Sequence, residues 1–301
     1  MADGTHIDID ALVALRLQAA RLDLDARREP RAHLAGGYRS RFRGRGMDFD
    51  ESRRYLPGDD IRTIDWRVTA RTGIPHTKVF REERERAVLI TVDFSPSMFF
   101  GTKVAFKSVI AAQAAAQIGW SAIARGDRIG VLIAAGEGHS EIRPAAGRRG
   151  VLRVLRALVQ KSNPQDCSVT PISMDDTLLR ARRVAKPGSL IVIISDFYTL
   201  GDDAERHLAR LCLHNDVVAC WVRDPLEYHA PPRGRYAISD GAQVANIETG
   251  GHASRQYEST LEGSARTVRT IIGGRGIRLI ELSTADDVGA ALQSGLVGSR
   301  L

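Results

Sequence analysis

The sequence predicts an α/β protein with a mainly parallel, doubly wound sheet that carries helices on both faces. Two apolar runs without charges, residues 87–92 and 190–194, have the composition of strands that are buried on both sides. Each run ends in a polar segment, and a helical pattern follows it. Because strand and helix patterns keep alternating to the C-terminus, crossover units are favoured over an antiparallel sheet.

Three segments are expected in chain order. Residues 1–35 should form an N-terminal helix over 8–29, because Leu and Ala supply an apolar side and Arg a solvated side. Residues 36–85 should form a small β-rich subdomain with short strands at 61–66 and 76–80. Residues 86–301 should hold the main sheet, with strands at 87–93, 129–134, 140–143, 189–195, 216–222 and 276–282, a hairpin at 235–247, and helices at 102–125, 147–160, 173–185, 202–214, 253–272 and 285–294.

Composition places the chain among ordinary globular proteins: its 301 residues are 43% hydrophobic and 26% charged. No apolar run reaches the roughly 18–20 residues of a membrane span, and the N-terminus lacks the basic and apolar regions of a signal peptide. A cytoplasmic location is therefore expected. The scattered Cys167, Cys212 and Cys220 predict neither a disulfide framework nor a zinc site.

The chain is basic, with a formal net charge of +7, and its densest basic stretch runs from Arg39 to Arg45. Arginine alternates there with Ser, Phe and Gly, at Arg39, Arg41, Arg43 and Arg45, which is a pattern that can bind phosphates. Acidic residues follow at once in 48–51, so we favour ion pairing within the chain. Nucleic-acid binding is kept as an alternative function.

Oxygen-bearing side chains follow both buried runs. Asp93, Ser95 and Ser97 form an Asp-x-Ser-x-Ser pattern after the first, and Asp196 follows the second. Ligands of open α/β sheets bind at the carboxyl ends of the strands, and parallel strands bring those ends to one edge, so Asp196 is expected near the other three. Such oxygens suit a hard cation such as Mg²⁺. The alternative is that they only cap a turn and a helix.

Further residues are candidates for contacts with a partner protein. Phe99 and Phe100 lie beside the proposed ion, and core packing is their equal alternative. A second candidate group surrounds the Pro57-Gly58 turn and consists of Arg53, Asp59, Asp60 and Asp65. For these acids we favour structural roles, as caps and as ion-pair partners of Arg, over a partner surface. Trp66 and Trp221 are expected in the core with their N–H groups satisfied.

The positions of Asp93, Ser95, Ser97 and Asp196 give the C-terminal region a pattern that resembles a von Willebrand factor type A domain. Those domains are Rossmann-like and hold a metal ion at an adhesion site. Residues 55–66, Tyr-Leu-Pro-Gly-Asp-Asp-Ile-Arg-Thr-Ile-Asp-Trp, resemble the signature of bacterial proteins grouped as domain of unknown function 58 (DUF58), in which such a region precedes a type A-like domain. The resemblance continues through 78–83, 126–130, 194–197 and 224–227, and so spans nearly the whole chain.

The resemblance implies a site for Mg²⁺ or Mn²⁺ whose oxygens come from three loops. Asp93, Ser95, Ser97 and Asp196 match two of them. The remaining loop departs from the usual Gly-Gly-Thr pattern, so either Thr170 or Ser173 is the candidate for its hydroxyl. Ser173 has Asp176 three residues on and is equally a candidate N-cap. A degenerate site that is retained only as a protein surface is the alternative.

The function implied is a non-enzymatic, protein-binding adaptor that works with a MoxR-type AAA+ ATPase in protein maturation or complex assembly. A metal ion with few carboxylate ligands would keep positive charge for a Glu or Asp of the partner. A metal-dependent hydrolase is the enzymatic alternative. The chain has neither a P-loop nor a Gly-x-Ser-x-Gly elbow, which argues against it.

Overall fold

The computed structural model describes residues 4–24, 47–82, 85–136, 138–163, 172–239 and 244–297. The chain divides into two compact units. The larger unit joins Met1–Arg27 to Arg86–Leu301, and the smaller unit is Arg28–Glu85. Each is described by itself below.

The larger unit is built on a six-stranded sheet, which confirms the predicted fold class. The strand order is β10-β7-β6-β3-β4-β5, and every neighbouring pair is parallel except β4 and β5. Both apolar runs lie at its centre as adjacent strands, with Val92 paired to Ile194. The strands are β3 (Ala87–Phe94), β4 (Arg128–Ala135), β5 (Gly138–Ala146), β6 (Leu190–Ser195), β7 (Asp216–Arg223) and β10 (Arg278–Ser283).

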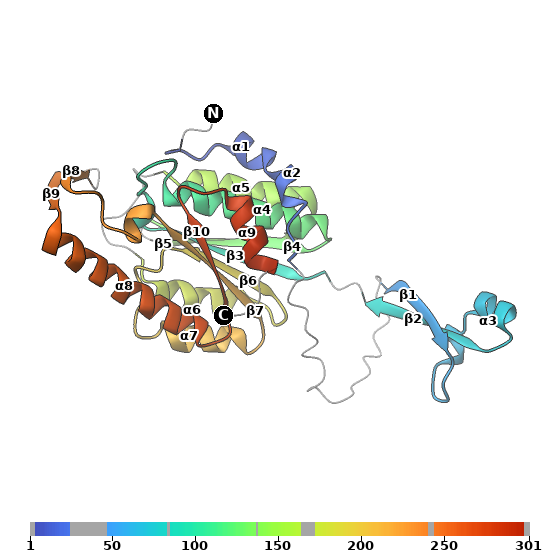
Figure 1. The fold of residues 1–301 in the computed structure, drawn as a ribbon. Coiled ribbons are helices and arrows are strands. Elements are labelled where there is room, and N and C mark those ends of the chain that lie inside the picture. Colours follow the sequence, from blue (N-terminus) through green and yellow to red (C-terminus); the bar gives the residue numbers. More distant parts are fainter. Residues whose placement is uncertain are drawn as a thin grey trace. The chain divides into compact units, whose positions relative to one another are not determined.

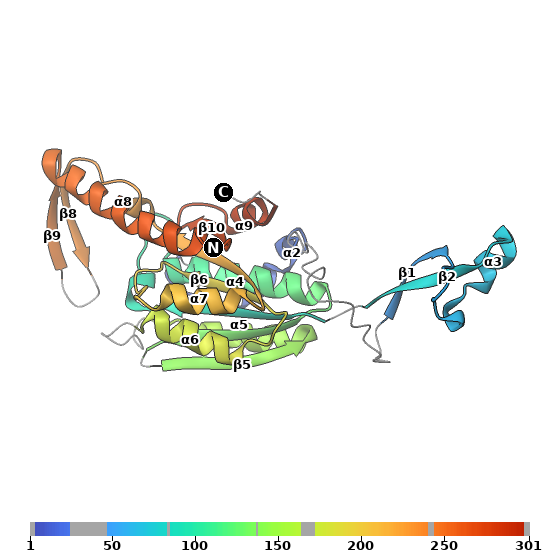
Figure 2. The same ribbon diagram turned by 90° about the horizontal axis from the view of Figure 1, so that it is seen from below.

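Helices cover both faces of this sheet (Figure 1). One face carries α4 (Lys107–Ala124), α5 (Gly147–Lys161) and α9 (Val288–Val297), and the other carries α6 (Met174–Val184), α7 (Ala204–Cys212) and α8 (Gly251–Gly273). Alternating side chains of β3 point to the two faces: Ile90 and Val92 enter the core under α4 and α5, and Leu89 joins a small cluster with Leu132 and Ala181 on the other face. The hairpin of β8 (Gly234–Ser239) and β9 (Val244–Thr249) lies beside α8 (Figure 2).

The expected N-terminal helix over 8–29 is wrong in extent. The structure instead has two short helices, α1 (Ile9–Ala14) and α2 (Arg16–Ala19), followed by a non-helical segment to residue 24. Residues 4–24 belong to the larger unit, and two hydrogen bonds tie them to α4. The indole N–H of Trp120 donates to the carbonyl oxygen of Leu12 at 3.0 Å, and the Ser121 hydroxyl donates to the carbonyl oxygen of Leu22 at 3.0 Å. Tertiary contacts therefore override the helical pattern after residue 19.

The smaller unit pairs β1 (Met47–Arg54) with β2 (His76–Glu82) in antiparallel fashion. The predicted strand at 76–80 is confirmed, but the one at 61–66 is wrong. A 3₁₀ turn, η2 (Ile61–Thr63), and a helix, α3 (Trp66–Thr72), take its place. Asp60 and Asp65 explain the difference, because their side chains accept from the amides of Arg62, Arg67 and Val68 and so cap both elements.

Two helices and the hairpin differ from the predictions only in detail. The helices expected from residues 102 and 285 begin later, at Lys107 and Val288. The hairpin is present, while its expected Asp240-Gly241 turn lies outside the described residues. Within the described part of the chain, no helix is long and apolar enough to cross a membrane.

Gly130 marks an irregularity where β4 meets the edge strand β5, since the register shifts between Ile129 and Val131. A Cβ atom on Gly130 would lie 2.6 Å from the Ile142 carbonyl oxygen and 2.7 Å from the Pro144 nitrogen. Gly130→Ala should therefore lower the free energy of unfolding by about 1–3 kcal/mol, because backbone atoms must move to admit the methyl group. Urea denaturation measures this change.

Gly138→Ala is the matched control, because a Cβ there meets nothing within 4 Å and its φ is not in the left-handed region. Equal unfolding free energies for the two variants would contradict the steric account of Gly130.

Candidate functional site

The two strands that lead to Asp93 and Asp196 are neighbours at the point where the order of strands in the sheet reverses. From β3 the chain continues to β4 on one side, and β6 adds to the other side of β3. Crevices at such switch points are where open α/β sheets bind ligands. Asp93 is the penultimate residue of β3, and Asp196 directly follows β6. The two carboxylates therefore flank this position.

Asp93 organises the loop that follows β3. It is buried, one of its oxygens accepts from the backbone N–H of Ser95 at 2.8 Å, and the other accepts from the Ser195 hydroxyl at 2.7 Å. The hydroxyl oxygens of Ser95 and Ser97 lie 3.2 Å apart in this loop. Ser95 occupies the N-cap position of the 3₁₀ turn η3 (Pro96–Met98), but its hydroxyl caps no backbone amide there. The Ser95 hydroxyl, which lies beside that of Ser97, therefore does not serve as a helix cap.

Asp196 is held by a buried cation that the sequence analysis did not identify. The Lys107 ammonium, at the first residue of α4, donates to Asp196 at 2.7 Å and to Glu227 at 2.6 Å. Lys107 and Asp196 have almost no exposed side-chain surface. Burial disfavours the ammonium charge, but Asp196 and Glu227 together raise the pKa of Lys107 above its ordinary value. The site therefore contains a permanent positive charge supplied by the chain.

Asp93 has no comparable partner: it forms no ion pair with any described residue. Burial, together with the nearby charge of Asp196, raises the pKa of Asp93 to about 6. A buried carboxylate in this condition is stabilised by an added cation. One carboxylate and two adjacent hydroxyls are hard oxygen donors, so the residues fit Mg²⁺ or Mn²⁺. The cation would neutralise charge that Lys107 leaves uncompensated at Asp93.

The segment before α6 contains Thr170 and Ser173, the two candidates for a further hydroxyl ligand. Thr170 lies outside the described residues, so its role stays a prediction. Ser173 is the N-cap of α6, and its hydroxyl accepts from the Asp175 amide at 3.1 Å. The neighbouring amide of Met174 donates to the carbonyl of Thr199, which ties this segment to the loop after β6. The structure thus shows Ser173 as a helix cap, and the residue after it contacts the loop that follows Asp196.

Another buried carboxylate, that of Asp224, braces the surrounding loops. Asp224 accepts from the amide and hydroxyl of Thr102, from the Leu226 amide and from the Thr284 hydroxyl. Burial alone would raise the pKa of Asp224, but these hydrogen bonds lower it below its ordinary value. Asp224 also forms a capping box with Glu227. Segments after β3, β7 and β10 are thereby fixed around the site.

The backbone after Asp196 is unusual. Phe197 has a φ of 60°, in the left-handed region that bulky residues rarely adopt. The Ser195 hydroxyl accepts from its amide at 2.9 Å, and Asp196 accepts from the amide of Tyr198 at 3.1 Å. Trp221 is buried as predicted, and its indole N–H donates to the Asp196 carbonyl at 3.0 Å. These contacts hold the strained turn and with it the carboxylate.

Most of the residues predicted to contact a partner protein form contacts within the chain instead. Phe99 packs on Phe94 with ring centroids 6.3 Å apart, and both Phe99 and Phe100 are half-buried. In the smaller unit, Arg53 pairs with Asp59 at 2.8 Å, and Asp60 and Asp65 are the caps described above.

Trp66 was expected in the core, and this expectation is wrong. Its side chain is 67% exposed, as are large parts of Leu56 and Ile61. Trp66 is the first residue of α3, a capped helix in which no described residue is buried. Arg39, Arg41, Arg43 and Arg45 lie outside the described residues, so the nucleic-acid alternative stays a prediction.

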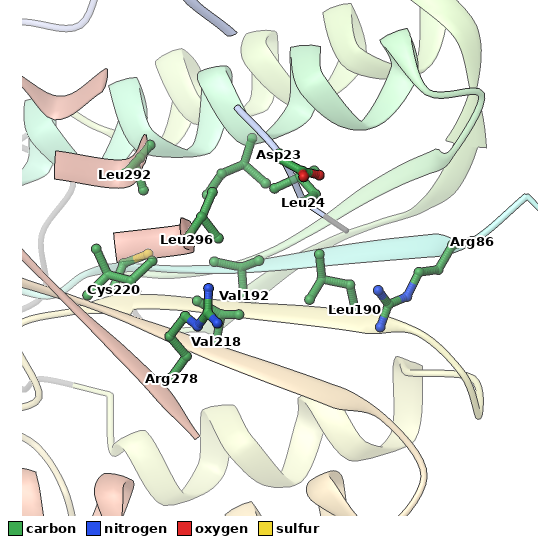
Figure 3. A pocket seen from close by; sticks show the side chains of 12 residues that line it. Asp23, Leu24, Arg86, Leu190, Val192, Val218, Cys220, Arg278, Leu292 and Leu296 are labelled. Atoms are coloured by element: carbon green, nitrogen blue, oxygen red, sulfur yellow. The ribbon is translucent and has the colours of Figure 1, made fainter. Parts of the chain in front are cut away.

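Two of the cavities in the larger unit border the residues discussed above or the core beneath them. One, of 180 Å³, is lined by Asp196, Glu227, Trp221 and Arg223 and by residues of α8. The other has only 20 Å³ and is lined mostly by aliphatic side chains between the sheet and α9 (Figure 3). Burial raises the pKa of the Cys220 thiol there to about 12, so Cys220 is an inert core residue. The second cavity is a packing gap of about one water molecule.

Lys107→Met should lower the free energy of unfolding by about 3–5 kcal/mol in EDTA, because Asp196 and Glu227 would remain buried without their counter-ion. Chemical denaturation at neutral pH measures this loss. Lys103→Met removes an exposed ammonium from the same connection and should change the free energy by less than about 1 kcal/mol. Equal free energies of unfolding for the two variants would contradict a stabilising role of the buried ion pairs of Lys107.

Comparison with known proteins gives the chain a family. It is 33% identical over 269 residues to uncharacterised proteins of Mycobacterium tuberculosis and Mycobacterium bovis, covering 88% of this chain and 84% of each relative. Solved structures to which it is similar include BatB from Bacteroides thetaiotaomicron, with 13% identity, 70% of this chain and 97% of that chain covered and a TM-score of 0.44. The SpRpn10 VWA domain is 11% identical, with 72% of this chain and 99% of that chain covered and a TM-score of 0.43. The model of the family described as protein of unknown function DUF58 matches residues 51–267, and the chain belongs to this family.

Proposed function

We propose that this protein is a non-enzymatic protein-binding module whose partner contact is the sheet edge formed by Asp93, Ser95, Ser97 and Asp196. The observation that carries the proposal is the buried Asp93 carboxylate beside two adjacent hydroxyls, with no ion pair to any described residue. Ser95, Ser97 and Asp93 would hold Mg²⁺ or Mn²⁺. A bound divalent ion supplies positive charge at the surface, to which a partner carboxylate can bind.

The ligand types favour binding over catalysis. No group of three His, Cys, Asp or Glu side chains that could hold a metal ion occurs among the described residues. A site made largely of neutral hydroxyls leaves charge on the ion for a partner. Lys107 contributes by pairing with both Asp196 and Glu227, so that its single positive charge offsets half of the negative charge that would repel an acidic partner group. The adaptor function rests on this electrostatic arrangement.

The partner that we propose is a MoxR-type AAA+ ATPase, in the cytoplasm, in a process of protein maturation or complex assembly. This part is supported by the DUF58 resemblance alone. The chain supplies the binding edge, and the ATPase would supply the energy from nucleotide hydrolysis.

Asp93→Asn separates metal binding from folding. In EDTA the variant should melt at the same or a higher temperature than the wild type, because a buried charge is removed while an oxygen remains for the Ser95 amide. Saturating Mg²⁺ should raise the wild-type melting temperature by several degrees, since a ligand at about 100 times its Kd stabilises by about 2.7 kcal/mol. The variant should not respond. Differential scanning calorimetry measures all four states.

Glu262→Gln on the exposed side of α8 removes one carboxylate away from the site and should respond to Mg²⁺ like the wild type. A wild type that shifts with neither Mg²⁺ nor Mn²⁺ would show that the edge holds no metal.

Affinity capture tests the partner. Tagged wild-type protein should retain a MoxR-type AAA+ ATPase from its own host extract in Mg²⁺, and EDTA or Asp93→Asn should reduce the recovered ATPase at least about tenfold, because the carboxylate contact is lost. Quantitative mass spectrometry, with Glu262→Gln as control, gives the ratio. Recovery that is equal in every condition would remove the metal from the contact, and absence of the ATPase would remove the partner.

A further inference from the structure

A groove of 590 Å³ lies at the end of the sheet opposite the candidate metal site. It is bordered by Ala87 and Arg128, the first residues of β3 and β4, and by Pro144 near the end of the antiparallel β5. The C-terminal half of α6 forms its other wall. Figure 2 shows β5 and α6 running beside each other in this part of the larger unit. The volume is in the range of natural ligand sites.

The lining is strongly basic. One acidic residue, Glu141, stands against five basic residues: Arg128, Arg143, Arg180, Arg183 and Lys186. Glu141 is reached by Arg143 at 3.9 Å and by Arg180 at 3.8 Å, distances that mark weak ion pairs. Arg183 and Lys186 are exposed and form no ion pair with any residue that the structure describes. The groove therefore carries unbalanced positive charge.

Between these charges the groove is apolar. Leu89, Val184, Ala185 and the rings of Pro144 and Pro187 belong to its lining. Leu89 lies in the small core cluster with Leu132 and Ala181, and Val184 and Ala185 pack against that cluster from its edge. A ligand that fills the groove must therefore combine negative groups with apolar ones.

The lining lacks the backbone arrangement that is typical of dedicated phosphate sites. The lining includes the C-terminal end of α6 and the residues that follow it, and no helix N-terminus. Phosphate sites commonly use backbone N–H groups at helix N-termini, and a helix C-terminus presents carbonyl oxygens instead. Recognition thus falls to separate Arg and Lys side chains, which pair well with carboxylates of Asp and Glu.

We propose that this groove binds an acidic segment of a partner protein in which Asp or Glu alternates with apolar side chains. The carboxylates pair with the basic rim, above all with Arg183 and Lys186, and the apolar side chains cover Val184 and the prolines. This contact is separate from the metal edge and does not require a metal ion.

The probe is a fluorescein-labelled peptide in which Glu and Val alternate, and its binding is followed by fluorescence anisotropy with the full chain in EDTA. The wild type should bind at low ionic strength and lose affinity as salt is added. The double variant Arg183→Glu, Lys186→Glu should bind at least about tenfold more weakly. A peptide with Ser in place of Val should also bind more weakly than the probe.

The matched control is Arg153→Glu, Arg156→Glu on α5, which covers the other face of the sheet. It changes the net charge by the same amount, at exposed positions with the same spacing, and should bind the probe like the wild type. Unchanged melting temperatures confirm that both double variants are folded. Failure of the wild type to bind, or equal weakening in both variants, would overturn the proposal. Oligothymidylate that binds more tightly than the peptide, with the same dependence on Arg183 and Lys186, would overturn it in favour of nucleic acid.

Discussion

The buried ammonium of Lys107 is the interaction on which the arrangement of the candidate site depends. Its hydrogen bonds connect the start of α4 to the turn after β6 and to the 3₁₀ turn Pro225–Glu227 after β7. These three segments carry, or directly adjoin, every described carboxylate of the site apart from Asp93. Because two carboxylates share one buried cation, neither can leave its position without exposing an unpaired charge to a low dielectric. The ion pairs therefore fix the geometry at a cost that ordinary surface pairs do not impose.

Most of the fold could be predicted from the sequence because its signals are local. The runs at 87–92 and 190–194 lack charges, and their burial on both faces follows from that composition. The proximity of Asp93 and Asp196 could be predicted as well, since the carboxyl ends of parallel strands share an edge. The error at 61–66 has a local cause too: Asp60 and Asp65 are strong caps, and capping outweighed the strand preference of the β-branched residues between them.

The partners of the site residues could not be predicted in the same way. Lys107 is 89 residues from Asp196 and 120 from Glu227, and a Lys at the first position of a helix opposes the helix dipole. Nothing near it in the sequence signals a buried role. The left-handed turn at Phe197 is also set by tertiary contacts, since the residue has no local preference for that conformation. Only the Asp224-Pro-Leu-Glu227 segment carried a readable sign, the spacing of a capping box.

The four hydrogen bonds of Asp224 have a consequence for how the protein acquires its function during folding. They join the chain near residue 102 to residue 224 and then to Thr284, across separations of 122 and 60 residues. Contacts this distant form late, because closing such loops costs entropy before any contact is gained. Thr284 directly follows β10, the most C-terminal of the strands that the structure describes. A nascent or truncated chain that lacks β10 can thus bury much of its sheet while the loops around the candidate site are still unassembled, and the proposed partner contact would form only after β10 has been made.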